Sequence, residues 1–199
     1  MMEIRISIDR NISGSKAKEV FDSVFYFQKL TTAIGSVVCK DEFSLSPIGM
    51  SALVDEGTTE QFKEFQSFNA VDENYSNIHL FVSSGDPFSD RIQGLTVGNI
   101  AIISAVKAGN TLWQPVIHEL GHTMGLVQED MNNYYNGSSK NHCSQWYCIM
   151  SNRPVEKELQ VGRYNDFRSK PENVFCKDCL NHLRTAKLEA LPWYNQVQK

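Results

Sequence analysis

The chain has 199 residues, of which 41% are hydrophobic and 21% are charged. These values are close to globular averages, so composition argues against disorder and against a membrane protein, and the length suits one domain. The formal net charge of −4 is small and the basic residues are scattered, so no basic surface for nucleic acid is indicated. No secretory signal and no membrane-spanning apolar run is recognisable. We therefore expect a cytoplasmic protein that binds neither nucleic acid nor membrane.

The N-terminal half of the chain alternates between strand and helix patterns. Residues 3–8 alternate apolar and polar side chains, which is typical of a half-buried strand. Residues 16–34 place apolar side chains at helical spacing, and Gly35 is expected to end that helix. The remaining predictions are strands at 37–45, 78–82 and 97–106 and a weaker helical pattern at 58–68.

Residues 112–124 are predicted to form the next helix. Asn110 or Thr111 precedes it and can serve as the N-cap. Pro115 is tolerated in the first turn, where a backbone N–H has no partner inside the helix. Gly125 is expected to end the helix, because glycine adopts the left-handed conformation that follows many helix C-termini.

Beyond this helix the character of the sequence changes. Residues 128–144 are polar, rich in Asn, Tyr and Ser, and without periodicity, which indicates a long loop. A last helix is predicted at 178–191, ending before Pro192. We interpret the chain, residues 1–199, as a single catalytic domain with an N-terminal subdomain, 1–125, and a C-terminal subdomain, 126–199.

The helix predicted at 112–124 contains His118-Glu119-Leu120-Gly121-His122, which has the form H-E-x-x-H. Residues i and i+4 share one helical face, so both imidazoles can reach a single ion. A catalytic zinc has three protein ligands and an open position for a water, whose pKa falls toward ~7. Glu119 lies beside the metal and is the candidate general base, which takes the water proton and passes it to the leaving amine.

The third zinc ligand has to be sought further along the chain. Gly125 stands where metzincin peptidases leave the helix to bring in a third histidine, and glycine tolerates the positive φ of that turn. Three residues later, where that histidine normally stands, this chain has Gln128, a poor zinc ligand. His142 is the leading candidate for the third ligand, and a carboxylate of Glu129 or Asp130 is the alternative.

Four of the five cysteines form two closely spaced pairs, Cys143 with Cys148 and Cys176 with Cys179. In a reducing compartment this pattern favours metal ligation over disulfides. Four thiolates can hold a structural zinc tetrahedrally at ~2.3 Å, and such a site contributes folding energy. Cys39 stands apart, and we expect it to be a small core residue.

His142 and Cys143 are adjacent in the sequence. Neighbouring residues of an extended chain point to opposite sides, so one can face the catalytic zinc and the other the structural zinc. The two sites are therefore expected to be mechanically tied, such that loss of the structural zinc loosens the third catalytic ligand.

Together these motifs resemble the archaemetzincins. The pattern reads H-E-L-G-H-T-x-G-L, then H-C-x4-C-x-M, then C-x2-C, and the resemblance covers about residues 94–183. This chain departs from the family in longer segments before His142 and between Met150 and Cys176. The resemblance implies that residues 97–106 include an edge strand above the cleft, to which an extended substrate pairs. It also implies catalytic zinc ligands at His118, His122 and His142, a general base at Glu119, a second zinc on Cys143, Cys148, Cys176 and Cys179, and the methionine of the Met-turn at Met150.

We accordingly expect an α+β, zincin-like fold: a twisted mixed sheet with a backing helix and an active-site helix, followed by an irregular C-terminal subdomain with one helix. The predicted function is zinc-dependent hydrolysis of peptide bonds, with two zinc ions, a peptide or protein substrate and a monomeric enzyme. The alternative is a non-catalytic, zinc-stabilised interaction module with a degenerate active site, which Gln128 favours. Glu119 favours the enzyme, because a purely structural metal site has no use for a carboxylate beside an open coordination position.

Overall fold

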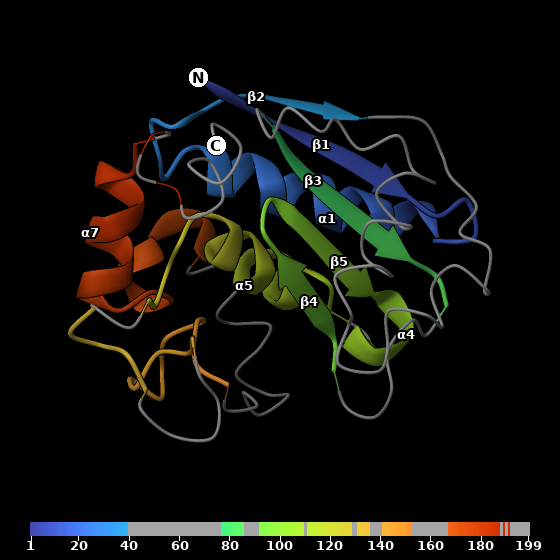
Figure 1. Cartoon of the computed structure of the whole chain (residues 1–199). Coiled ribbons are helices and arrows are strands. Elements are labelled where there is room, and N and C mark those ends of the chain that lie inside the picture. The colour runs from blue at the N-terminus through green and yellow to red at the C-terminus, as the bar shows by residue number, and fades with distance from the viewer. Residues whose placement is uncertain are drawn as a thin grey trace.

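The computed structural model describes residues 1–39, 77–85, 92–109, 111–128, 131–135, 141–152, 167–187, 189 and 191 (Figure 1). Within these ranges the strands are β1 (Met2–Ile8), β2 (Ile34–Cys39), β3 (Asn77–Ser83), β4 (Gly94–Val97) and β5 (Ile100–Ser104). The helices are α1 (Gly14–Gln28), α4 (Ala105–Ala108), α5 (Trp113–Thr123), the short 3-10 helix η1 (Pro171–Asn173) and α7 (Lys177–Thr185).

The five strands form one mixed sheet in the order β2-β1-β3-β5-β4. β1 pairs in parallel with β2 and β3, and β3 pairs in parallel with β5. β4 is antiparallel to β5 and forms one edge of the sheet. The two residues between β4 and β5 are Gly98 and Asn99, and Gly98 has a φ of 60°. Such a two-residue hairpin needs positive φ, which glycine adopts without steric cost.

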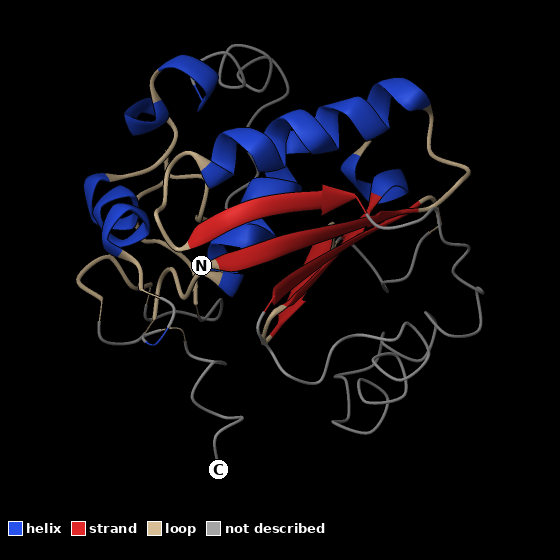
Figure 2. Cartoon of the chain, turned by 90° about the horizontal axis from the view of Figure 1, so that it is seen from above, coloured by secondary structure: helices blue, strands red, loops and turns tan. Residues whose placement is uncertain are grey.

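Helices α1 and α5 pack side by side on one face of the sheet (Figure 2). β1 alternates buried and partly exposed residues, as a strand with one face on the core does. Every residue of β3 and β5 is buried, as is typical of central strands covered on both faces. α1 adds Val20, Val24 and Phe27 to this core, all fully buried.

The predicted fold class is confirmed, and most predicted elements are present. The first strand and the strand at 78–82 are confirmed as β1 and β3. The strand predicted at 97–106 is β5 alone, because the chain turns after Val97 and enters α4 at Ala105. The edge strand is therefore β4, which overlaps that prediction only at Val97.

Three boundary predictions are wrong, two of them because a strand pairs where the helix was expected to continue or end. α1 ends at Gln28 rather than at 34, because residues from Ile34 onward pair with β1. Gly35 consequently lies within β2 and does not end the helix. α7 ends at Thr185, where Ala186 turns to an extended conformation, rather than continuing to 191. The helix predicted at 58–68 and residues 40–45 lie outside the described part of the chain.

Cys39 was expected in the core, and that expectation is wrong because this residue is exposed. It ends β2, an edge strand of the sheet, where one side of the strand has no neighbouring strand. Its apolar neighbours in the sequence therefore did not predict burial.

The N-terminus of α5 is held by a side chain of α1. Leu112 occupies the N-cap and has no side chain that can accept a hydrogen bond, so the predicted cap at Asn110 or Thr111 is wrong. Instead, Glu19 Oε1 accepts hydrogen bonds from Leu112 N at 2.9 Å and Trp113 N at 3.1 Å. A carboxylate also interacts favourably with the positive end of the helix dipole.

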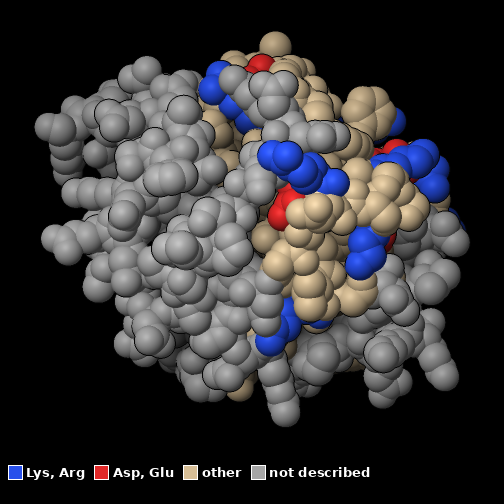
Figure 3. All heavy atoms as spheres, turned by 90° about the vertical axis from the view of Figure 1, so that its right-hand side faces the viewer, with Lys and Arg blue, Asp and Glu red and all other residues tan. Residues whose placement is uncertain are grey.

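Within the described residues, no helix is both long enough and apolar enough to cross a membrane. Figure 3 looks onto the end of the molecule where α4 lies, at the right of Figure 1. The Lys and Arg side chains described on that face are separated by uncharged atoms, and acidic atoms lie beside several of them.

Replacing Glu19 with alanine is expected to destabilise the protein by removing the acceptor for two N–H groups of α5. Loss of an N-terminal cap costs about 1 kcal/mol, which corresponds to a fall in Tm of roughly 2–4 °C for a chain of this size. Thermal unfolding followed by circular dichroism measures this shift. Asp22→Ala is the matched control, because Asp22 lies on the same helix but only pairs at the surface with Lys18. Equal Tm values for the two variants would contradict the role of Glu19.

Candidate functional site

Helix α5 presents His118 and His122 on one face. The two Nε2 atoms are 3.1 Å apart and the ring centroids are 4.7 Å apart. A tetrahedral ion with bonds of ~2.0–2.1 Å requires ligand nitrogens about 3.3 Å apart. The two imidazoles therefore have the spacing that one metal ion requires.

The turn after α5 follows the pattern expected from Gly125. Gly125 has a φ of 73°, and its N–H donates to His122 O at 2.9 Å. Leu126 N donates to Gly121 O at 3.0 Å. These two bonds form a Schellman motif, which ends the helix and turns the chain sharply. Val127, two residues after Gly125, has a φ of 61°, a conformation that β-branched residues rarely adopt. The sharp turn of the backbone after α5 therefore extends to Val127.

His142 returns to the same place from the loop beyond. Its ring centroid lies 5.1 Å from that of His118 and 5.3 Å from that of His122. The ring nitrogens of the three histidines that could serve as ligands lie within 4.8 Å of one another. Glu129 and Asp130, the alternative ligands, lie outside the described residues.

Backbone pairing fixes the chain on both sides of His142. Tyr135 N donates to His142 O at 2.8 Å, and Ser144 N donates to Asn133 O at 2.8 Å. These bonds pair Tyr134 with Cys143 as an isolated antiparallel bridge. Near its C-terminal end, where His142 lies, the loop predicted at 128–144 is thus held in place by backbone hydrogen bonds.

His118 is oriented by a backbone carbonyl. Its Nδ1 lies 2.7 Å from Ile149 O, and since a carbonyl only accepts, Nδ1 must carry the proton. Nε2 is then left with a free lone pair on the side of His122 and His142. Burial lowers the pKa of His118, against the opposing effect of the Ile149 carbonyl. Burial and the two neighbouring imidazoles hold the pKa of His122 well below its usual value. Both rings are therefore neutral at pH 7, which is the form that binds a metal.

Glu119 is buried, with 6% of its surface exposed. Burial raises the pKa of its carboxyl to about 7, while a hydrogen bond from Thr96 and the charge of His142 act in the opposite direction. Thr96 Oγ1 donates to Glu119 Oε2 at 2.7 Å. The sequence reasoning missed Thr96 because it missed β4. The available signal was the Gly98-Asn99 pair, a dipeptide typical of two-residue hairpins.

Met150 packs beneath the same helix and is fully buried. A Cβ on Gly121 would run into Met150 Sδ. Gly121 therefore allows Met150 to approach the backbone of α5 between the two histidines. The resemblance to the archaemetzincins implies that the methionine of the Met-turn lies at this place, beneath the histidines.

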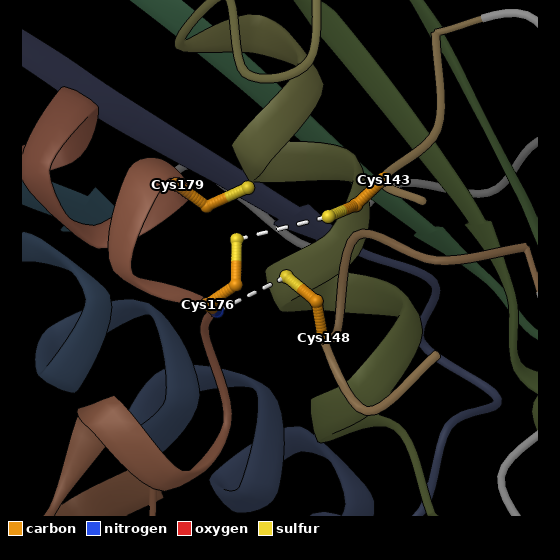
Figure 4. Close-up of side chains that lie close together, drawn as sticks. All are labelled: Cys143, Cys148, Cys176 and Cys179. Atoms are coloured by element: carbon orange, nitrogen blue, oxygen red, sulfur yellow. Dashed lines mark hydrogen bonds between the residues drawn. The ribbon is translucent and has the colours of Figure 1, made fainter. Parts of the chain in front are cut away.

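The four paired cysteines form a second buried cluster, which Figure 4 shows with all sulfurs directed toward one another. Cys143 and Cys148 come from the loop, Cys176 is the N-cap of α7, and Cys179 lies in its first turn. The four sulfurs lie within 4.8 Å of one another, and Cys143 Sγ is 3.7 Å from Cys176 Sγ. Tetrahedral zinc with bonds of ~2.3 Å requires sulfurs about 3.8 Å apart. The cluster therefore fits a zinc ion.

Asn133 lies against this cluster and is 1% exposed. Its Nδ2 is 3.2 Å from Cys143 Sγ, 3.3 Å from Cys176 Sγ and 3.0 Å from Cys179 Sγ. Cys176 N also donates to Cys148 Sγ at 3.3 Å. Such N–H donors stabilise thiolate charge and orient the ligands of a metal. Sequence spacing gave no signal for Asn133, because its place beside the sulfurs depends on the folded loop.

The thiols of the cluster perturb one another. Hydrogen bonds from Cys143, Cys148 and Cys179 lower the pKa of the Cys176 thiol. Hydrogen bonding with the other three raises the pKa of Cys179. Thiolates this close repel one another, so all four can ionise together only around a cation.

The mixed sheet, with its antiparallel edge strand beside a helix that carries H-E-x-x-H, defines a zincin-like domain. The chain is similar to the archaemetzincin of Methanopyrus kandleri, with a TM-score of 0.54 and 16% identity over 92% of this chain and 93% of that chain. The expected resemblance is thereby confirmed for the fold, which is that of an archaemetzincin.

Two of the other solved structures that match are also 16% identical to this chain. A zinc-dependent peptidase from Methanocorpusculum labreanum has a TM-score of 0.48 over 91% of this chain and 100% of that chain. An archaemetzincin from Archaeoglobus fulgidus, complexed with malonate, has a TM-score of 0.45 over 91% and 99%. No protein-family model matches the sequence, and the search of curated proteins finds no match.

We expect Cys176→Ser to release one metal ion and lower stability, because serine is a weak zinc ligand and the bound metal contributes folding energy. Loss of a structural metal belongs to the largest class of destabilising changes, about 4 kcal/mol or more, which is a fall in Tm of roughly 10 °C. Elemental analysis and thermal unfolding measure the two effects.

Cys39→Ser is the matched control for this variant, because Cys39 is exposed and lies outside the cluster. It should keep the metal content and the Tm of the unmodified chain. Full metal content and unchanged Tm in Cys176→Ser would rule out a structural metal on these cysteines.

Proposed function

We propose that this chain is a zinc-dependent metallopeptidase of the metzincin type, which hydrolyses peptide bonds. The convergence of three imidazoles beside a buried carboxylate, Glu119, supports this proposal most directly. The similarity to the fold of a known archaemetzincin agrees with it. A purely structural metal site gains nothing from a buried carboxylate next to a ligand, since burial of that group is costly.

In this proposal each residue has one role. His118, His122 and His142 bind the catalytic ion and leave its fourth position open. When bound, zinc supplies a Lewis acid that polarises the scissile carbonyl and lowers the pKa of water. Glu119 takes a proton from the attacking water and delivers it to the leaving amine. Its raised pKa, about 7, suits a group that must both accept and donate a proton near neutral pH.

We also propose that the cysteine cluster holds a second, structural zinc that supports the catalytic site. Cys143 follows His142 directly, and Ile149, whose carbonyl oxygen binds His118 Nδ1, follows Cys148. Of the three catalytic ligands, His142 is therefore itself the neighbour of a cysteine ligand, and His118 is oriented by such a neighbour, Ile149. Elemental analysis of the purified protein should accordingly give two zinc ions per chain, one for each ligand group.

Replacing Glu119 with glutamine should abolish peptide hydrolysis while both zinc ions remain bound. General-base catalysis contributes about 10²–10⁴-fold in rate, and glutamine keeps the size of the side chain but cannot accept the proton. The measurement is kcat on a peptide cleaved by the unmodified chain, identified from a broad peptide library. Glu172→Gln, an exposed glutamate on η1, is the matched control.

Undiminished cleavage by Glu119→Gln would show that Glu119 is not the base. A zinc-replete unmodified chain that cleaves no member of the library would instead favour the non-catalytic binding module.

His142→Ala should weaken binding of the catalytic zinc strongly and leave the cysteine site occupied. The reason is that two imidazoles remain where three are needed. Titration with a zinc chelator, read as zinc retained per chain, measures the loss. Gln128→Ala tests the usual position of the third ligand and should change nothing, and His182→Ala controls for removal of a histidine outside the site. Zinc retention by His142→Ala equal to that of the unmodified chain would show that another group is the third ligand.

A further inference from the structure

Two residues of the edge strand β4 contact the carboxylate of Glu119. Gly94 and Thr96 are two positions apart, so both point to the same face of the strand, toward α5. Gly94 pairs with Ile103 and Thr96 pairs with Ala101 of β5, so the position of both is fixed by the hairpin. The strand that borders the site therefore also meets the proposed base.

The hydroxyl of Thr96 lies between two oxygens of Glu119. Thr96 Oγ1 is 2.7 Å from Glu119 Oε2 and 3.0 Å from the backbone oxygen of the same residue. One hydroxyl thus joins the end of the side chain to its own backbone and to β4. Among the described residues, this is the hydrogen bond that the Glu119 carboxylate makes.

Gly94 acts through the absence of a side chain. A Cβ at this position would lie 2.6 Å from Glu119 Cγ and 2.8 Å from Oε1, closer than real Cβ atoms approach their neighbours. The residue has no positive φ that would require glycine, so space rather than backbone conformation is the reason for it. Any larger residue would push the Glu119 carboxylate out of its place.

This fixation matters because glutamate has a flexible side chain. Freezing a long side chain in one rotamer costs conformational entropy. A base that is left free would spend much of its time in rotamers that cannot reach the reacting water, and a displacement of ~1 Å can reduce the rate about 10²-fold. The contacts from β4 restrict Glu119 before the substrate arrives.

We infer that Thr96 is a positioning residue for Glu119, and that Gly94 provides the space in which Thr96 holds the carboxylate. This inference rests on the proposed peptidase function, in which Glu119 is the base. In this inference β4 borders the site and also holds the base, Glu119, in the position from which it takes the proton.

The test compares Thr96→Val, which keeps the shape but loses the hydroxyl, with Thr96→Ser, which keeps the hydroxyl. Thr96→Val should lower kcat by about 10- to 100-fold with little change in KM, because the base is displaced while substrate binding is not. Thr96→Ser should stay within about threefold of the unmodified kcat, the remaining loss reflecting the greater χ1 freedom of serine. Zinc content should be the same in both variants.

Ser23→Ala is the matched control for loss of a buried hydroxyl. Ser23 is fully buried, and its Oγ donates to a helix carbonyl, that of Glu19, at 2.6 Å, without contact to the site. It should lower stability as Thr96→Val does and leave kcat unchanged. Should Thr96→Val fail to fold, Gly94→Ala keeps the hydroxyl and should also lower kcat by displacing Glu119.

Crystal structures of the zinc-loaded variants supply a readout that is independent of activity. The Glu119 carboxylate should move away from its present place in Thr96→Val and remain there in Thr96→Ser. An unmoved carboxylate, or an unchanged kcat in Thr96→Val, would overturn the inference while leaving the proposed function intact. An unmodified chain that is inactive although zinc-replete would overturn the proposed function, and the Glu119 position in the variants would still decide the role of Thr96.

Discussion

The backbone hydrogen bond from Cys143 N to Met150 O, 2.9 Å long, is the constraint on which both clusters depend. It closes residues 143–150 into a loop whose two ends lie together. His142 then points toward α5 from one end, while Ile149 O reaches His118 from the other. Met150 packs under α5 at the point where Gly121 leaves space. A single closed loop thereby directly follows one histidine, orients a second, and supplies two of the four cysteines.

The price of this arrangement is the burial of many titratable groups in a small volume. Burial disfavours the charged forms of His118 and Glu119, and the clustered thiols cannot all ionise unless a cation lies between them. A divalent ion at each centre would offset these costs, because it favours neutral imidazoles and negative thiolates as ligands. Metal binding would thus be linked to folding of the C-terminal part. The donors of Asn133 and of the Cys176 backbone agree with this, because they are arranged for sulfur that carries negative charge.

The sequence predicted those parts of the fold and of the site that depend on local spacing. The helix that carries His118 and His122, the turn at Gly125, and strands β1 and β3 all follow from periodicity or from one glycine. It was wrong where long-range pairing decides the outcome. Gly35 lies within a strand because β2 pairs with β1, and the predicted cap of α5 is replaced by Glu19, which is distant in the sequence.

By itself the sequence determined which chemical groups are present and which of them are neighbours along a helix or a tight turn, because spacings of two to four residues fix their relative directions. The sequence made His142 the leading candidate for the third ligand, and only the tertiary structure decided that its ring lies beside the two helix histidines. The tertiary structure also decided that Thr96 reaches Glu119, since strand register and helix packing bring together residues that are far apart in the chain. Those contacts arise from many weak interactions summed over the whole core, and no local pattern in the sequence encodes them.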